Sequence, residues 1–383
     1  MCPTESFVTT VSYANTVRPM SNHNVSVTRC DSKRLSSLLA ALSICVPVML
    51  TGCAKELEEP PPLQPADVSF LVALGSASNF AAQTEGGHGV LLPLPVFELL
   101  PMLTRVDEPS AIYDSLQVVA VRLDPCFHEG LGNITCSPQI RLVLQPVVDG
   151  DFGNPTTRDA TVHLFFSVPL PELTDIANEI AFDRMRAGRN SQPGVIDEPD
   201  AVVQALLPHL GAGRLTRLTF VAVHASGQAW TFGGFDRQGE AWVPLVIPGS
   251  DEPEQHLTST GGFHDLDATI LPGPLIESDI SAFLDADERA DIDSEAVQAA
   301  EFALVRLLDP GTHNPGTVDC ASCHMATTAL QFLRSAPGQP DFDFAYEDSQ
   351  NQRMFGFYGR LPSISPRVLS ETELVLQRFR NER

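Results

Sequence analysis

Three residues near the C-terminus have types and spacing that could do chemistry: Cys320, Cys323 and His324, in the order Cys-Ala-Ser-Cys-His. Two thiols three residues apart can form a disulfide, ligate a metal ion or be alkylated to thioethers. The adjoining imidazole is a common ligand of iron and zinc. A zinc site would need two more cysteine or histidine ligands, and the sequence offers only His313 nearby, with no second Cys-x-x-Cys.

The same five residues resemble the haem-attachment motif of c-type cytochromes. In that family the two thiols add to the haem vinyl groups, and the histidine becomes the proximal ligand of the iron. The resemblance covers only residues 294–383, and it implies a covalent haem c held by Cys320, Cys323 and His324. A Cys320–Cys323 disulfide is the next alternative, and half of a zinc site is the last.

The resemblance also directs attention to a second axial ligand of the iron. Met354 lies downstream, where a family methionine would fall, so it is the first candidate. His313 is the second candidate, and an open five-coordinate iron is the third. Met325 adjoins the proximal histidine and cannot reach the opposite haem face. Against Met354, a methionine among aromatic residues is often simple core packing.

The N-terminal segment has the pattern of an export signal. Residues 35–50 form an uncharged apolar run that follows Lys33 and Arg34 and ends just before Cys53. Basic residues, a short apolar run and small residues before a cleavage point are typical of secreted precursors. The run is too short for a comfortable transmembrane helix. Leu50–Cys53 also resembles the bacterial lipobox, in which the cysteine is acylated and becomes the first residue of the mature lipoprotein.

The lipobox resemblance implies a chain that is anchored to a membrane of the cell envelope through lipid on Cys53. Ala54 is not the aspartate that commonly retains lipoproteins at the inner membrane, so the outer membrane is favoured. An uncleaved anchor with a coincidental cysteine is the alternative, and the chain could start at Met1 or at Met20. Export agrees with the haem motif, because c-type maturation takes place outside the cytoplasm.

The other cysteines belong to the predicted signal, the lipobox or the Cys-x-x-Cys-His motif, so Cys126 and Cys136 remain to be assigned. An oxidising envelope compartment favours a disulfide between them. A metal site that also uses His128 would lack a fourth ligand. The sequence therefore predicts a Cys126–Cys136 disulfide and no remaining free thiol.

Residues 67–260 have mostly β patterns. In Gln139–Gln145, apolar residues alternate with Arg141, Val143 and Gln145, which indicates a strand with one buried face. Helices are expected at Pro171–Ala187, which ends before Gly188, and at Asp200–Leu210. Together these patterns predict an antiparallel sandwich or sheet with helices at one side. The other expected strands are Val68–Leu74, Leu116–Leu123, Thr161–Val168, Leu218–His224, Gln228–Phe232 and Glu240–Ile247.

The C-terminal part has helical patterns. A helix is expected at Ser294–Leu308, and a second at Glu371–Phe379 after a capping box that starts at Ser370. The acidic stretch Asp285–Asp293 only partly matches a calcium-binding loop, so a solvated turn is favoured. Histidines in strand or turn patterns are interpreted as structural and without a chemical role: His163, His224 and His264.

The expected fold class is α+β, with an antiparallel β-rich N-terminal domain that contains two helices and a small helical, haem-binding C-terminal region. The expected parts are a signal peptide at 1–52, an acidic, proline-rich tether at 53–66, the β-rich domain at 67–260, an acidic linker at 261–293 and the cytochrome-like region at 294–383.

The charge balance narrows the possible partners. The chain has 48 acidic and 24 basic residues, a net charge of −24. Such a surface repels phosphate backbones and excludes nucleic-acid binding, whereas it favours a basic redox partner protein. The expected function is one-electron transfer. The alternative is a binding or sensor lipoprotein in which the β-rich domain carries the function. Di-haem peroxidases need two such motifs, so this enzyme class is disfavoured.

Overall fold

A computed structural model gives the fold of most of the chain after the predicted signal. The described residues all fall within one compact unit, Glu58–Arg383. The predicted signal peptide and Cys53 lie outside them, and among the described helices none has the length and apolar character to cross a membrane. The structure describes residues 60–75, 80–101, 103, 109–128, 136–150, 153–158, 160–223, 229–250, 252–259, 266–267, 294–334 and 355–382.

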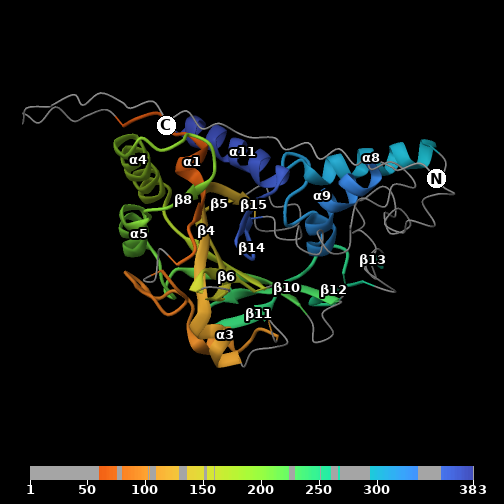
Figure 1. The fold of residues 1–383 in the computed structure, drawn as a ribbon, viewed down its shortest axis with the longest axis horizontal. Helices are drawn as coiled ribbons and strands as arrows, with labels where there is room; N and C mark the ends of the chain where they lie inside the picture. Colours follow the sequence, from red (N-terminus) through yellow and green to blue (C-terminus); the bar gives the residue numbers. More distant parts are fainter. Residues whose placement is uncertain are drawn as a thin grey trace, which may run out of the picture. The chain divides into compact units, whose positions relative to one another are not determined.

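The fold is α+β and is built on a mixed 11-stranded sheet (Figure 1). The described strand pairings are antiparallel except for the parallel pair β1–β8. The strand order is β13-β12-β10-β9-β7-β5-β4-β1-β8, and β6 and β11 pair with β5 and β10. The strands are β1 Ser69–Val72, β4 Leu116–His128, β5 Cys136–Asp149, β6 Pro155–Thr157, β7 Thr161–Ser167, β8 Val195–Ile196, β9 Leu215–Val223, β10 Ala229–Gln238, β11 Ala241–Pro244, β12 Glu254–Ser259 and β13 Leu266–Asp267.

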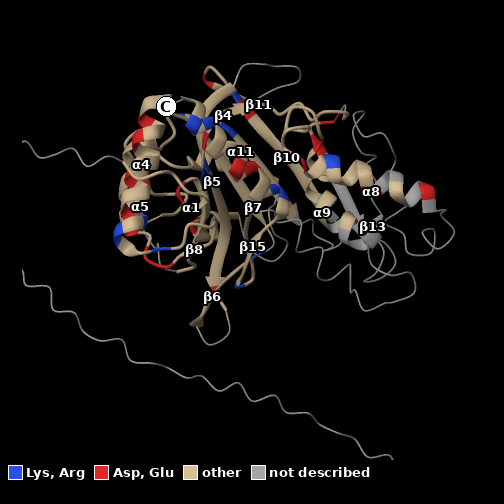
Figure 2. Cartoon of the chain, turned by 90° about the horizontal axis from the view of Figure 1, so that it is seen from above, with Lys and Arg blue, Asp and Glu red and all other residues tan. Residues whose placement is uncertain are grey.

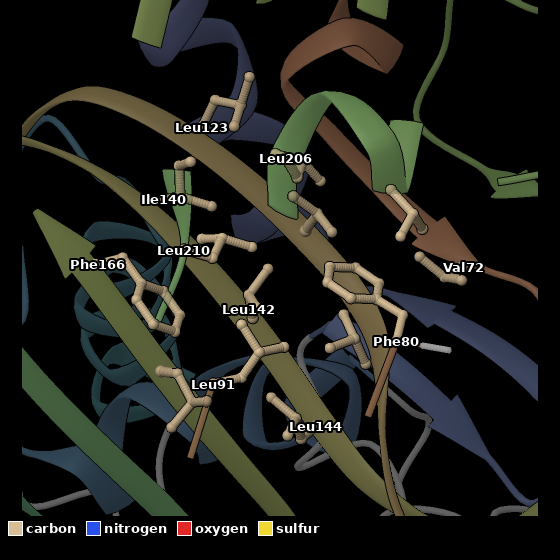
Figure 3. Close-up of a cluster of buried hydrophobic side chains, with 14 of the residues drawn as sticks. Val72, Phe80, Leu91, Leu123, Ile140, Leu142, Leu144, Phe166, Leu206 and Leu210 are labelled. Atoms are coloured by element: carbon tan, nitrogen blue, oxygen red, sulfur yellow. The ribbon is translucent and has the colours of Figure 1, made fainter. Parts of the chain in front are cut away.

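One face of the sheet packs against helices α1 (Pro65–Val68), α4 (Leu170–Ala187) and α5 (Asp200–Leu206), which Figure 1 shows together beside β4. Ile140, Leu142 and Leu144 of β5 point into this core, as the alternation in the sequence predicted. Figure 3 shows several of the core side chains, among them Ile140, Leu142, Leu144, Phe166 and Leu206.

The predicted long helix is confirmed as α4. It starts after Pro169 and ends at Gly188, whose φ of 64° is the left-handed conformation that glycine adopts readily at a helix end. Its apolar side chains Leu173, Ile176 and Ile180 are buried against the sheet. The second predicted helix is shorter than expected, because Pro208 leads into a 3₁₀ turn, Leu207–His209.

The opposite face of the sheet is also covered, although the sequence predicted helices at one side only. A hairpin of β14 (Phe355–Tyr358) and β15 (Leu361–Ile364) packs its phenylalanines against Val119 and Val143. Gln145 fixes this hairpin, because its Nε2 donates to the carbonyl of Phe357 at 2.9 Å and its Oε1 accepts from that residue's N–H at 2.7 Å.

The C-terminal region adds α8 (Ser294–Leu308), which has the predicted range, α9 (Cys320–Arg334) and α11 (Pro366–Glu382). The start predicted for the last helix was wrong. Ser370 lies inside α11, and its hydroxyl donates to the carbonyl of Pro366. The helix begins earlier because a proline is suited to the first helical position and Ser365 Oγ accepts from the N–H of Val368 at 3.3 Å.

Helix α11 belongs to the main core of the protein. Its side chains Val375, Leu376 and Phe379 are buried in the same apolar cluster as α4 and the sheet. The C-terminal region and the β-rich region therefore share a core. The remaining elements are small: β2 Glu85–Gly86, β3 Gly89–Val90, α2 Leu94–Phe97 and α3 Pro109–Ser115.

Candidate functional site

The Cys-x-x-Cys-His motif forms the first turn of α9. Asp319 caps this helix, because its Oδ1 accepts from the N–H of Ser322 at 2.8 Å. Residues three and four positions apart lie on the same face of a helix, so Cys320, Cys323 and His324 present their side chains in one direction. The helix start is tied to β12, because the N–H of Ala321 donates to Oε1 of buried Gln255 at 3.1 Å.

All three motif residues line one cavity between α9 and the sheet. The volume of the cavity is about 130 Å³. Its opposite wall is formed mainly by side chains of β5, β7 and β9 that lie outside the main core. The residues of that wall are Arg141, Val143, His163, Phe165, Arg217, Thr219 and Val221.

The strand register arranges this wall in rows across the sheet. Val143, His163 and Thr219 are successive partners on β5, β7 and β9. The adjacent row contains Arg141 and Phe165. Neighbouring side chains on one face of a sheet lie close enough to interact, so an imidazole sits in the middle of the wall between apolar and basic neighbours.

His163 faces the cavity from β7 and is half-buried. Its Nδ1 lies 3.0 Å from Oγ1 of Thr219, a hydrogen bond whose direction depends on the tautomer. Burial lowers the pKa of His163 well below 6.5, and the charges of Arg141 and His324 lower it further. The imidazole is therefore neutral near pH 7, which is the form that binds metal ions.

The other imidazole, His324, is held from the side by an aromatic ring. The ring of Phe232 on β10 packs against it with centroids 5.1 Å apart. Phe232 is buried and lines the same cavity. This contact restricts the orientation of the His324 ring at the cavity wall.

The two motif cysteines carry free thiols in the structure. Burial raises the pKa of Cys320 to about 12, and the nearby charge of Asp319 adds to this effect. Burial raises the pKa of Cys323 as well. Cysteines that work in thiol–disulfide exchange have a lowered thiol pKa, so this environment is unlike that of a redox-active pair. Within the described part of the chain, no group of three His, Cys, Asp or Glu residues is arranged to hold a metal ion.

A cluster of charged residues closes one end of the cavity. Glu371 of α11 pairs with Arg122 of β4 and with Nε of Arg367 at 3.0 Å, and Arg141 lies 3.6 Å from it. Burial alone would raise the pKa of Glu371, but the charges of these arginines outweigh it and hold the pKa at about 2. Opposite charges that are paired in this way can be buried beside an apolar site.

His313, the second candidate ligand from the sequence, lies elsewhere. It is buried beside a smaller, adjoining cavity that Arg122 and Arg378 also line. The carbonyl of His313 accepts a hydrogen bond from Nη2 of Arg367 at 2.8 Å, which fixes its backbone. His313 therefore lines the adjoining cavity and not the one that the motif residues line.

Other predicted site residues have varied outcomes. Cys126 and Cys136 are joined by a disulfide that links the end of β4 to the start of β5. Cys53 and Met354 lie outside the described residues. Sequence reasoning gave no role to His163, although the β7 alternation could have shown that it lies on the face opposite Leu164 and Phe166.

Comparisons with known proteins give no further guide to this site: no family model matches the sequence, and neither the curated proteins nor the solved structures contain a match.

Proposed function

We propose that the chain is an envelope lipoprotein that carries one covalent haem c at Cys320, Cys323 and His324 and transfers single electrons. One observation supports this proposal above the others. The motif residues share one face of α9 and open onto a cavity whose far wall combines aromatic, apolar and arginine side chains. A haem has the matching chemistry, because it is an apolar ring with two carboxylates at its edge.

The residues around the cavity suit this group. Thioethers at Cys320 and Cys323 would hold it, and the imidazole of His324 would ligate the iron. Phe165 and Phe232 provide apolar surface for the ring. Arg217, which donates to Asp236 from Nη2 at 3.0 Å and is held in place by it, would offer its remaining N–H groups to a haem carboxylate. The bound haem would supply the Fe³⁺/Fe²⁺ couple for one-electron transfer.

The residues around the cavity would set the reduction potential of this couple. The rings of Phe127 and Phe165 pack with centroids 5.5 Å apart at the cavity wall and would limit the access of water to a haem bound there. Exclusion of water disfavours the more highly charged iron state, and nearby arginines do the same. Gln255 and Asp319 keep the start of α9 in place, so the proximal imidazole keeps its position when the charge of the site changes.

The haem proposal is tested by expressing the full chain in a host that matures c-type cytochromes. We expect the absorption bands of a reduced c-type haem, and an intact mass that exceeds polypeptide plus lipid by one haem. A Cys320→Ala/Cys323→Ala variant should lose both signals. The matched control, Cys126→Ala/Cys136→Ala, removes the other cysteine pair and should keep them. A wild-type protein without bound haem would overturn the proposal.

The lipid anchor is part of the same proposal and rests on the lipobox at Cys53. A Cys53→Ser variant should appear in the soluble envelope fraction or retain its signal, and its mass should lack the acyl groups. Two or more acyl chains are needed for stable anchoring, since each buried methylene contributes about 0.8 kcal/mol. Mature wild-type protein that is recovered without lipid from a lipoprotein-processing host would contradict this part.

A further inference from the structure

Two histidines line the cavity from opposite walls. His324 comes from the first turn of α9, and His163 comes from the middle of β7 in the sheet. Both side chains border this one cavity. The sequence gives no hint of this proximity, because 161 positions of chain separate them by their residue numbers.

We propose that His163 is the second axial ligand of the iron, so that the haem lies between α9 and the sheet with one imidazole on each side. This inference rests on the proposed function, and it replaces Met354 and His313, the ligands that the sequence suggested. It assigns the sheet a direct role in the cofactor site, since β7 would supply the distal ligand.

The local chemistry of His163 suits this role. A histidine that ligates a metal usually donates its other ring N–H to a neighbouring acceptor, which fixes the ring and its tautomer. Thr219 Oγ1, 3.0 Å from Nδ1, is such an acceptor. With Nδ1–H donating to Thr219, Nε2 carries the lone pair that can bind iron. Both residues lie on adjacent strands in direct register, so the pair is held by the ladder itself.

On the described residues, His313 is a weaker candidate than His163. His313 lies beside the adjoining cavity, and Arg367 holds its carbonyl there. Phe232 already packs on the ring of His324 and offers no donor atom. Met354 precedes β14, whose Phe355 lines the cavity, so the experiment must distinguish a methionine sulfur from an imidazole.

The test uses the full-length, haem-loaded protein with optical, electron paramagnetic resonance and carbon monoxide measurements. The wild type should be low-spin with two imidazole ligands and should resist carbon monoxide. His163→Gly should become high-spin, and its carbon monoxide affinity should increase at least tenfold. Added imidazole should restore the low-spin spectrum of His163→Gly. His209→Ala is the matched control, because His209 pairs with Glu172 of α4, on the other face of the sheet.

The outcomes separate the two proposals. A wild-type protein without haem overturns the proposed function and this inference with it. Haem that is bound but stays low-spin in His163→Gly overturns the inference alone, and loss of a methionine signature in Met354→Ala would then assign that residue. A wild type that is already high-spin also overturns it. If His163→Gly does not accumulate, the wild-type resonance spectrum still decides between two imidazoles and an imidazole with a thioether.

Discussion

Arg122 of β4 and Glu371 of α11 form an ion pair between residues 249 positions apart in the chain. The Arg122 side chain is only 2% exposed, and its guanidinium also donates from Nη2 to the carbonyl of Val368 at 2.9 Å. Three arginines converge on the one carboxylate. This cluster holds the start of α11 against the sheet at one end of the cavity. The position of the C-terminal helix and the shape of the site therefore depend on each other.

Removal of the carboxylate should strongly destabilise the protein. Glu371→Gln leaves Arg122 buried without its counter-charge, and breaking such a pair costs roughly 3–5 kcal/mol. Urea unfolding monitored by circular dichroism measures this loss. Glu373→Gln, an exposed position two residues along the same helix, is the control and should change the free energy of unfolding little. Equal effects of the two substitutions would contradict the assigned role.

The same carboxylate predicts an acid-labile contribution to stability. Its pKa is about 2 in the folded protein and 4.5 ordinarily, so the folded state favours the ionised form. The contribution is present in full above about pH 4.5 and is lost as the pH falls toward 2. The difference in stability between wild type and Glu371→Gln should therefore shrink across that interval. A difference independent of pH between 5 and about 2 would show that the effect is not electrostatic.

The disulfide between Cys126 and Cys136 should stabilise the β4–β5 pair. It closes a short loop, with a sequence separation of 10. Because the bond restricts the unfolded chain, it should raise the free energy of unfolding by about 2–3 kcal/mol. Cys126→Ala/Cys136→Ala should lower the urea midpoint by a corresponding amount, and reductant should lower that of the wild type equally. A reductant effect in the double variant would point to another disulfide.

Substitutions at two adjacent residues of β5 distinguish the effects of core packing from the effects of the cavity wall. Leu142→Ala opens a hole in the main core and should lower the free energy of unfolding by roughly 2–5 kcal/mol, with little change in the spectrum of the proposed haem. Val143→Ala lies at the cavity wall and should shift the midpoint potential of the proposed haem downward, because water would gain access to it. Redox titration and urea unfolding of both variants measure the two effects. A larger spectral change in Leu142→Ala would mean that the faces are assigned the wrong way round.

The surface charge should govern reactions with small redox probes. Figure 2 shows acidic residues on α4, α5, α8 and α11, and the net charge of the chain is −24. If the chain carries the proposed haem, oxidation of its reduced form by hexaammineruthenium(III) should slow as salt is added, whereas oxidation by ferricyanide should become faster. Stopped-flow rates at several ionic strengths test this. Parallel salt dependences for both oxidants would argue against a long-range electrostatic effect.

Much of the sheet could be predicted from local patterns. The β5 alternation and the proline and glycine at the ends of α4 are local signals, and both led to correct elements. The covered second face could not be predicted, because Arg141 and Gln145 are polar. They are buried or half-buried through partners in α11 and β14 that come more than 200 residues later. The start of α11 was missed because the capping box at Ser370 is a stronger local signal than Ser365-Pro366.

The candidate site was predicted in part for the same reason. The motif at Cys320–His324 is contiguous and could be read directly. The wall that faces it takes alternate residues from separate strands, and only the pairing register brings His163 beside Thr219. A single histidine in a strand carries no sign of what lies across from it, so its chemistry emerges only from the tertiary structure.

The two faces of β7 have different surroundings, and this determines which mutations the strand tolerates. Val162, Leu164 and Phe166 point to one side and His163 and Phe165 to the other, so each class can be redesigned while the opposite set stays untouched. In contrast, deleting one residue from this strand would turn the side chains on one side of the deletion to the opposite face of the sheet. Insertions and deletions in β7 should therefore be far less tolerated than point substitutions at its cavity-facing positions.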